Sequence, residues 1–227
     1  MNEMRTEGTP ARVPAAGKPR RRSASRARSV AFCGLSVALL AVCAWVTVPL
    51  GPVPFTLQIF AAVFALCALS PRECLAVFAI YLLMGTVGLP VFSGMRGGIG
   101  VIAGPSGGFL WGYLVGAAVA VAARVALARL AAAVGKESQR AACSPVVEGH
   151  AHAAFAKGCA PSLAVDIVTG ALFVMVAYAC GCAWYMFVAQ VDLAAAILTS
   201  VVPFVLVDAL KTVAAVLAAR AVRKAVR

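Results

Sequence analysis

The stretch SVAFCGLSVALLAVCAWVTVPLGPVPFTLQIFAAVFALCALSP (Ser29–Pro71) contains no charged residue, and GPVPFTLQ (Gly51–Gln58) interrupts it in the middle. A helix needs about 20 mostly apolar residues to cross a bilayer, so the stretch is long enough for two crossings. The interruption contains a glycine and two prolines, and proline ends a helix because it lacks the N–H that a helix needs. The stretch therefore predicts two membrane-spanning helices joined by an irregular segment.

The rest of the chain has the same character. Residues 74–95, 97–123 and 167–191 are also free of charge. Of the 227 residues, 63% are hydrophobic and 12% are charged, and the mean hydropathy is +0.95. A soluble domain of this size could not bury so much apolar surface. We therefore expect an all-α integral membrane protein with one membrane domain, residues 29–219.

The apolar segments and the breaks between them predict six transmembrane helices. The breaks are the 51–58 interruption, the short turn at residues 70–73, a glycine-rich segment at 89–108 and a polar segment at 131–157. The expected helices cover about residues 29–48, 56–70, 74–88, 109–130, 161–188 and 193–219.

The net charge of +12 indicates how these helices are oriented. Lys and Arg stay on the cytoplasmic side of membrane proteins. With six spans, a basic tail over residues 1–28, the 131–157 loop and a basic tail over residues 220–227 all lie on one side, and the outer loops hold only Arg96 and Asp192. We expect both termini to be cytoplasmic, in a multi-pass protein of the cell membrane, and the first tail to be disordered.

The positive charge thus has an explanation that does not involve nucleic acid. Arginines beside a membrane span contact anionic lipid, so the lipid bilayer is the expected partner. The sequence contains no P-loop pattern GxxxxGK[ST] and no HExxH, and neither the cysteines nor His150 and His152 have metal-ligand spacing. We expect no enzymatic activity, no metal and no cofactor, and energy supplied by partner subunits.

The charged residues that cost the most free energy to place inside a membrane lie in the last expected helix. Asp208 and Lys211 are three residues apart in PFVLVDALK, so they share a helix face. An ionisable residue inside a membrane is by default a functional hypothesis. Two interpretations are open and compatible: a mutual ion pair that neutralises both charges, or a polar floor that accepts N–H groups and donates to a carbonyl or carboxylate.

Two further charged residues, Arg96 and Asp166, indicate a role toward a ligand less clearly. Arg96 lies in the glycine-rich segment, where it is either an exposed loop residue or a bidentate ligand for an anionic group. Asp166 is near the start of the fifth expected helix, where we expect it to cap the helix or to contact a loop lysine, with no role toward a ligand.

Four motifs, in order and spacing, resemble the BioY family, the biotin-specific substrate-binding subunits of energy-coupling factor (ECF) transporters. The motifs are VPLGPVPFTLQ (Val48–Gln58), YLLMGTVGLPVFSG (Tyr81–Gly94), GPSGGFLWGY (Gly104–Tyr113) and PFVLVDALK (Pro203–Lys211). The resemblance extends over about residues 29–219. The basic first tail and the 131–157 loop depart from the compact family pattern.

The resemblance implies a six-helix bundle with a biotin pocket near the outer face, covered by the 51–58 segment and the glycine-rich loop. It implies partners as well: a membrane scaffold subunit and two cytoplasmic ATPase subunits, the only users of ATP. The implied ligand-binding residues are Asp208, Lys211, Arg96, Tyr81, Thr56, Gln58 and Phe92. The implied contact with the scaffold is the small-residue side of the first helix, at Ala31, Gly34, Ala38 and Ala41.

Two alternatives remain open. The chain could be a subunit of the same transporter class for another vitamin. It could also be a membrane scaffold or an intramembrane enzyme, which ranks last because Asp208–Lys211 is the only acid–base pair that we find within the expected spans.

Overall fold

A computed structural model describes residues 20–49, 53–138 and 162–225, which are mostly helical. The helices are α1 (Arg20–Trp45), α2 (Gln58–Ala68), α3 (Pro71–Thr86), α4 (Ile99–Ala103), α5 (Gly107–Ser138), α7 (Leu163–Ala189), α8 (Leu193–Ser200) and α9 (Val202–Ala225), with a 3₁₀ turn η1 (Ser93–Met95). Two short strands, β1 (Thr47–Val48) and β2 (Phe55–Thr56), pair antiparallel, with Thr47 opposite Thr56. The all-α class is therefore confirmed.

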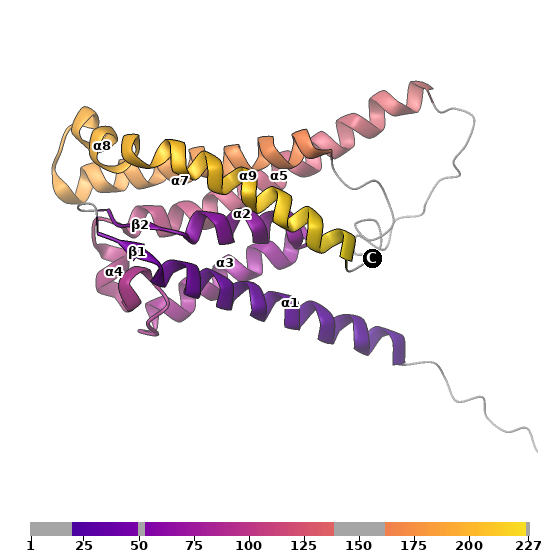
Figure 1. Cartoon of the computed structure of the whole chain (residues 1–227), viewed down its shortest axis with the longest axis horizontal. Coiled ribbons are helices and arrows are strands. Elements are labelled where there is room, and N and C mark those ends of the chain that lie inside the picture. The colour runs from indigo at the N-terminus through magenta and orange to yellow at the C-terminus, as the bar shows by residue number, and fades with distance from the viewer. Residues whose placement is uncertain (1–19, 50–52, 139–161, 226–227) are drawn as a thin grey trace, which may run out of the picture.

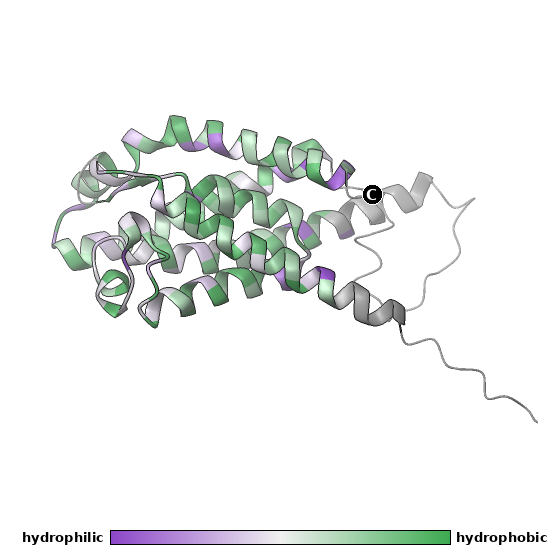
Figure 2. Cartoon of the chain, turned by 60° about the horizontal axis from the view of Figure 1, so that its bottom comes forward, coloured by the Kyte–Doolittle hydropathy of each residue, from purple (hydrophilic) through white to green (hydrophobic). Residues whose placement is uncertain are grey.

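The long helices lie side by side along one direction (Figure 1). We call the end that holds β1, β2, α4 and α8 the loop end, and the end that holds the start of α1 and the end of α9 the basic end. Hydrophobic residues dominate along most of the helical segments (Figure 2). The interruption in the opening stretch therefore lies at the loop end, where the chain turns back into α2.

By length, some of the expected spans can cross a bilayer as single straight helices and others are too short. Among the residues that the structure describes, three helical segments are long and apolar enough to cross a bilayer: 27–45, 107–127 and 163–189. A fourth candidate is the bent pair formed by α8 and α9. Helices α2 and α3 have 11 and 16 residues, so at 1.5 Å per residue they are about 16 and 24 Å long, less than the roughly 30 Å of a bilayer core. Length alone thus supports three to four spans.

The last expected helix is broken, which corrects the prediction of one helix over 193–219. Helix α8 ends at Ser200, α9 begins at Val202, and the two axes differ by 52°. Pro203 provides the cause: its ring has no N–H to donate and conflicts with the carbonyl four residues earlier. The Asp192 side chain caps α8, because its Oδ1 accepts a hydrogen bond from the N–H of Ala195 at 3.4 Å.

Three helix boundaries extend beyond their expected positions. Helix α1 begins at Arg20, inside the tail that we expected to be disordered, α5 continues to Ser138, inside the expected 131–157 loop, and α9 continues to Ala225. Arg, Ala and Lys are good helix formers, and no proline falls in these extensions, so the helices continue. The rest of the tails and of the loop, residues 1–19, 139–161 and 226–227, lies outside the described residues.

Helices α5 and α7 pack closely through glycines. A Cβ atom on Gly112 would lie 2.9 Å from the carbonyl oxygen of Ala177, and one on Gly116 would lie 3.0 Å from that of Phe173. The two backbones could not approach so closely with any larger residue, as is usual where membrane helices pack. Sequence reasoning assigned such a small-residue face to the first helix and missed this one. The rings of Tyr113 and Phe173 stack between the same helices at 5.8 Å.

A buried carboxylate holds three helices together at the basic end. Asp166 of α7 is fully buried and pairs with Arg124 of α5, with Arg220 of α9 at 3.1 Å, and with Arg223 of α9 at 2.6 Å. Arg124 also donates to the carbonyl oxygen of Leu66 in α2 at 2.6 Å. The expectation of a cap or a lysine contact at Asp166 was therefore wrong, because the three arginines come from helices that only the tertiary fold brings together.

Asp166→Asn should destabilise the protein by about 3–5 kcal/mol, because it leaves the buried charge of Arg124 without its counter-ion. Chemical denaturation of the purified protein in mild detergent measures the change. Asp192→Asn is the matched control: Asp192 is exposed, and Asn caps a helix as well as Asp, so its effect should stay within about 0.5 kcal/mol. Equal stability of the two variants would contradict a structural role for the cluster.

Candidate functional site

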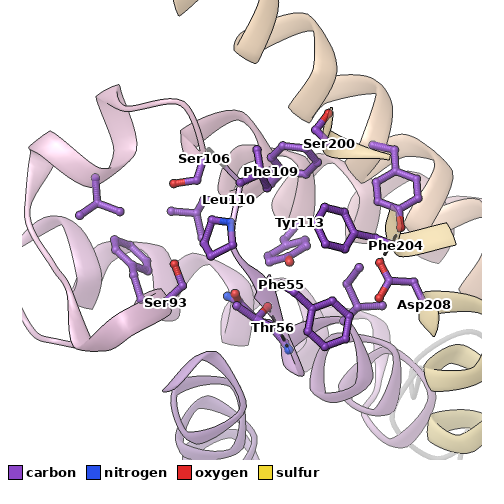
Figure 3. Close-up of a pocket in the computed structure, with 17 residues that line it drawn as sticks. Phe55, Thr56, Ser93, Ser106, Phe109, Leu110, Tyr113, Ser200, Phe204 and Asp208 are labelled. Carbon is purple, nitrogen blue, oxygen red and sulfur yellow. Dashed lines mark hydrogen bonds between the residues drawn. The ribbon is translucent and has the colours of Figure 1, made fainter. Parts of the chain in front are cut away.

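A small cavity lies at the loop end, under the β1–β2 hairpin and the glycine-rich loop. Its volume is about 60 Å³. Side chains from the hairpin, the loop, α2, α5, α7, α8 and α9 point into it (Figure 3). The lining residues are Val53, Pro54, Phe55, Thr56, Gln58, Ile59, Phe92, Ser93, Val101, Ser106, Phe109, Leu110, Tyr113, Tyr178, Ser200, Phe204 and Asp208. The cavity thus combines aromatic walls with a small number of polar groups.

Asp208 is the only charged residue among those that line this cavity, and its two carboxylate oxygens have different partners. Lys211 Nζ donates to Oδ1 at 2.8 Å, and the hydroxyl of Tyr178 donates to Oδ2 at 2.5 Å. Asp208 and Lys211 are 3% and 7% exposed, so the pair is buried. The two side chains share a helix face, as the sequence predicted, and they form the ion pair that was one of the two open interpretations.

Lys211 connects this pair to the hairpin. Its Nζ donates to the carbonyl oxygen of Thr56 at 2.7 Å and lies 3.6 Å from the centre of the Phe55 ring, a cation–π contact. The Phe55 ring in turn stacks on Phe204 at 5.8 Å. Lys211 itself is not part of the cavity lining and lies behind Asp208 and Phe55. The hairpin is therefore fastened to α9 by the same cation that neutralises Asp208.

A second buried chain of hydrogen bonds supports the part of the lining that Gln58 and Phe92 form. Gln58 Nε2 donates to the hydroxyl oxygen of Tyr81 at 2.7 Å, and Tyr81 donates to the carbonyl oxygen of Val91 at 2.8 Å. Gln58 lines the cavity, whereas Tyr81 stands behind it and packs edge-on against Phe92. Tyr81 thus orients Gln58 and Phe92 instead of facing the cavity. Gly85 leaves the space for the Phe92 ring, since any Cβ there would overlap it.

Arg96 is the one predicted ligand-binding residue that the structure leaves outside this cluster. It is exposed, does not line the cavity, and its Nε donates to the carbonyl oxygen of Ser93 at 3.2 Å. Thr56, Gln58, Phe92 and Asp208 line the cavity, and Lys211 and Tyr81 lie directly behind them.

Sequence reasoning missed several lining residues, above all Tyr178, Tyr113 and Ser200. Tyr178 and Tyr113 lie within the charge-free stretches 167–191 and 97–123, which was an available signal, since a buried tyrosine hydroxyl usually has a partner. Ser200 gave no such signal, because its place depends on the break between α8 and α9. Its hydroxyl donates to the carbonyl oxygen of Ala196 at 2.6 Å and lies 3.5 Å from Cys182 Sγ.

Ser106 stands in Gly104–Gly108 (GPSGG), which matches the GxSxG pattern of serine hydrolases by letters. That pattern is active only as a strand–turn–helix elbow. Here helix α4 precedes the turn, so the required context is missing. In the described ranges, moreover, no group of three or more His, Cys, Asp or Glu side chains could hold a metal ion.

The fold and this cavity define a helical membrane protein with a small cavity beneath two loops. The BioY family profile matches residues 17–227, and the chain belongs to the BioY family, as the four sequence motifs predicted.

Curated relatives agree with this assignment. The biotin transporter BioY of Thermotoga maritima is 44% identical over 92 residues, which cover 40% of this chain and 54% of that protein. The probable biotin transporter BioY of Pyrococcus horikoshii is 39% identical over 95 residues, covering 42% of this chain and 59% of that protein. The matched stretch thus spans somewhat more than half the length of these two relatives.

A solved structure supports the fold. It is described as the S-component for biotin from an ECF-type ABC transporter. It superposes with a TM-score of 0.68 and covers 88% of this chain and 93% of its own, at 21% sequence identity.

Lys211→Met should lower stability by about 3–5 kcal/mol, because it leaves the buried Asp208 charge without its cation. Asp208→Leu likewise leaves Lys211 as an unpaired buried charge. The double variant Asp208→Leu/Lys211→Met removes both charges, so its loss of stability should be smaller than the sum of the losses in the two single variants. Denaturation curves recorded without added ligand measure all three variants. A Lys211→Met protein as stable as the parent would show that the pair does not hold the hairpin to α9.

Proposed function

We propose that this protein is the biotin-specific substrate-binding subunit of an ECF-type uptake transporter. The observation that carries the proposal is the buried Asp208–Lys211–Tyr178 cluster at the cavity of a BioY-family chain. Relatives named as biotin transporters support the choice of ligand. On this proposal the chain binds and releases its ligand unchanged, without a cofactor, and is not an enzyme.

The chemistry of the cavity agrees with biotin. Biotin has a ureido ring with two N–H donors and one carbonyl acceptor, an apolar thioether ring and a carboxylate tail. Asp208 can accept the ring N–H groups, and Lys211 can donate to the carbonyl, in exchange for the hydrogen bonds that they make to Tyr178 and Thr56. Phe55, Phe109 and Phe204 provide apolar walls for the thioether ring.

Ligand entry on this proposal requires the loops to move. Ligand pockets usually measure about 300–1,000 Å³, and this cavity measures about 60 Å³. The hairpin residues Val53–Phe55 and the loop residues Phe92 and Ser93 form its cover, so we assign them the role of a lid. The Trp45 side chain fastens the glycine-rich loop to α1, because its Nε1 donates to the carbonyl oxygen of Pro90 at 2.7 Å. Arg96, on the same loop, would contact the biotin carboxylate once the loop has moved.

Biotin should bind the purified protein in detergent with a Kd below about 1 μM, as expected of a specific site. Asp208→Ala should abolish binding. Asp208→Asn, which keeps the shape of the side chain, should weaken binding by about tenfold or more, since a charge-assisted hydrogen bond is lost. Isothermal titration calorimetry measures the affinities, and thermal unfolding shows whether each variant is folded.

A folded Asp208→Asn variant with the parent's affinity would mean that the pair is structural only. Failure of the parent to bind biotin, with binding of another vitamin, would favour the alternative of a sister subunit. Biotinamide, which lacks the carboxylate, isolates the role of Arg96. Arg96→Gln should weaken binding of biotin and leave binding of biotinamide unchanged.

We further propose six spans with both termini in the cytoplasm, in the cell membrane. The described start of α1 and the end of α9 lie at the same end of the bundle (Figure 1), which agrees with an even number of crossings. That end carries Arg220, Arg223 and Lys224, as the cytoplasmic side should. Protease should remove tags on both termini in inside-out vesicles and neither tag in intact spheroplasts. Cleavage of either tag in spheroplasts would contradict this orientation.

The partners that we propose are a membrane scaffold subunit and two cytoplasmic ATPase subunits. The small-residue face of α1 offers a surface for the scaffold: Ala31, Gly34 and Ala38 are exposed, and a Cβ on Gly34 would have no atom within 4 Å. Such faces allow close approach of a second helix. Ala41, predicted with them, packs into the core instead and is 8% exposed.

Ala38→Leu should reduce the amount of scaffold subunit that co-purifies with the tagged chain, because a larger side chain separates the two helices. Ala118→Leu is the matched control, since Ala118 is exposed on α5. Both variants should bind biotin normally, as neither residue lines the cavity. Equal recovery of the scaffold with both variants would exclude this face of α1 as the contact.

A further inference from the structure

A long apolar groove runs along the outside of the bundle, on the other side of Tyr178 from the cavity. Its volume is about 700 Å³, and it lies between α7 and the α8–α9 pair. One wall is a stripe on α7 that includes Ala171, Met175 and Met186, and the other includes Ile197 of α8 and Val213 of α9. We call it the lateral groove. The bend at Val201 opens it, because α9 departs from the line of α8 by 52°.

The lining offers hardly any polar group to an occupant. Of the lining residues, Tyr178, Thr212 and Cys182 carry a hydroxyl or thiol. The Tyr178 hydroxyl donates to Asp208 Oδ2, Thr212 Oγ1 donates to the carbonyl oxygen of Asp208 at 2.8 Å, and Cys182 Sγ lies 3.5 Å from Ser200 Oγ. Each therefore already has a partner in the protein, so the groove suits a hydrocarbon and not a polar molecule.

The dimensions favour a single chain of methylene groups over a protein helix. The lining extends on α7 from Ile167 to Met186, about 28 Å at 1.5 Å per residue, so the mean cross-section is about 25 Å². An α-helix with its side chains is about 10–12 Å wide, so it could enter this open groove only in part. A hydrocarbon chain, whose carbons approach their neighbours to about 4 Å, has a matching section.

Positive charge marks one end of the lateral groove. Next to Ile167, the ion pair of Asp166 with Arg220 bridges α7 and α9 at 3.1 Å. Val213, Leu217, Arg220 and Lys224 follow one another on one face of α9, and Lys224 is exposed. Charged residues at a helix end lie at the level of the lipid headgroups, where lysine and arginine attract anionic lipid.

We propose that the lateral groove binds an acyl chain of an anionic phospholipid, with the headgroup at Arg220 and Lys224. One leaflet supplies about half of the roughly 30 Å hydrocarbon core. The chain therefore occupies the half of the groove next to the charged residues, from Ile167 and Val213 to Tyr178 and Val205. There it packs against the ring of Tyr178, whose hydroxyl holds Asp208. The site is independent of which ligand the cavity takes.

Photo-crosslinking tests this proposal on the full chain in phosphatidylcholine nanodiscs. The probe is phosphatidylglycerol with a photoreactive diazirine in the middle of one acyl chain, and mass spectrometry of digested protein locates the adducts. Adducts should concentrate on residues 171–178 and 205–213. An even spread over the exposed faces of α1, α3 and α5 would overturn the proposal.

Substitutions test the contacts of the acyl chain and those of the headgroup separately. Ala171→Phe fills the groove and should remove most of the adducts, whereas Ala118→Phe, on the exposed face of α5, should leave them unchanged. Lys224→Gln should lower the preference for the phosphatidylglycerol probe over its phosphatidylcholine analogue by about fivefold, in line with the attraction of one cation for an anionic surface. Arg72→Gln, exposed on α3, is its control and should leave the preference unchanged.

Equal labelling of the two Phe variants, or equal labelling by the two probes in the parent protein, would overturn the site. Size-exclusion chromatography confirms that each variant is folded, and the adduct map of the unmodified chain needs no variant. Biotin titrations on the same samples keep the outcomes apart, since a parent protein that binds biotin normally but shows no concentration of lipid adducts on residues 171–178 and 205–213 would refute only the lateral groove.

Discussion

The buried carboxylate of Asp208 is the interaction on which the loop end of the molecule depends. A charge at this depth is tolerated only with partners, and Lys211 and Tyr178 occupy its two oxygens. Because Lys211 also bonds the Thr56 carbonyl and lies against Phe55, the same ion pair fixes the hairpin over the cavity. On the function that we propose, binding and closure are coupled, because a ligand that competes for Asp208 and Lys211 also weakens the contacts that hold the cover in place.

The basic end of the bundle is organised around the other buried carboxylate. Asp166 draws together arginines from α5 and α9, and Arg124 extends the cluster to α2. Between the two ends, the glycines of α5 let it pack tightly on α7. The bundle is thus firmly joined at the basic end and along α5–α7. At the loop end, polar contacts of Lys211 and Trp45 hold the hairpin and the glycine-rich loop, and on the function that we propose these contacts give way when the cover opens.

The break at Pro203 shapes both the cavity and the lateral groove. On the inner side it brings Ser200 and Phe204 to the cavity, and on the outer side it opens the lateral groove between α7 and α9. Tyr178 stands between the two, lining both and holding Asp208. The occupant of the groove and the ligand of the cavity would therefore meet the same side chain from opposite faces.

The membrane class, the breaks near residues 51–58 and 70–73, and the shared helix face of Asp208 and Lys211 could all be predicted from the sequence, because composition, helix breakers and i, i+3 spacing act locally. Its four motifs also identified the family. Only the tertiary structure decided that Asp166 meets three arginines, that Tyr178 reaches Asp208, that Tyr81 stands behind the cavity, and that Arg96 remains outside it. These outcomes depend on which helices become neighbours and on the bend at Pro203. Contacts between residues tens of positions apart have no period or spacing in the sequence from which they could be read.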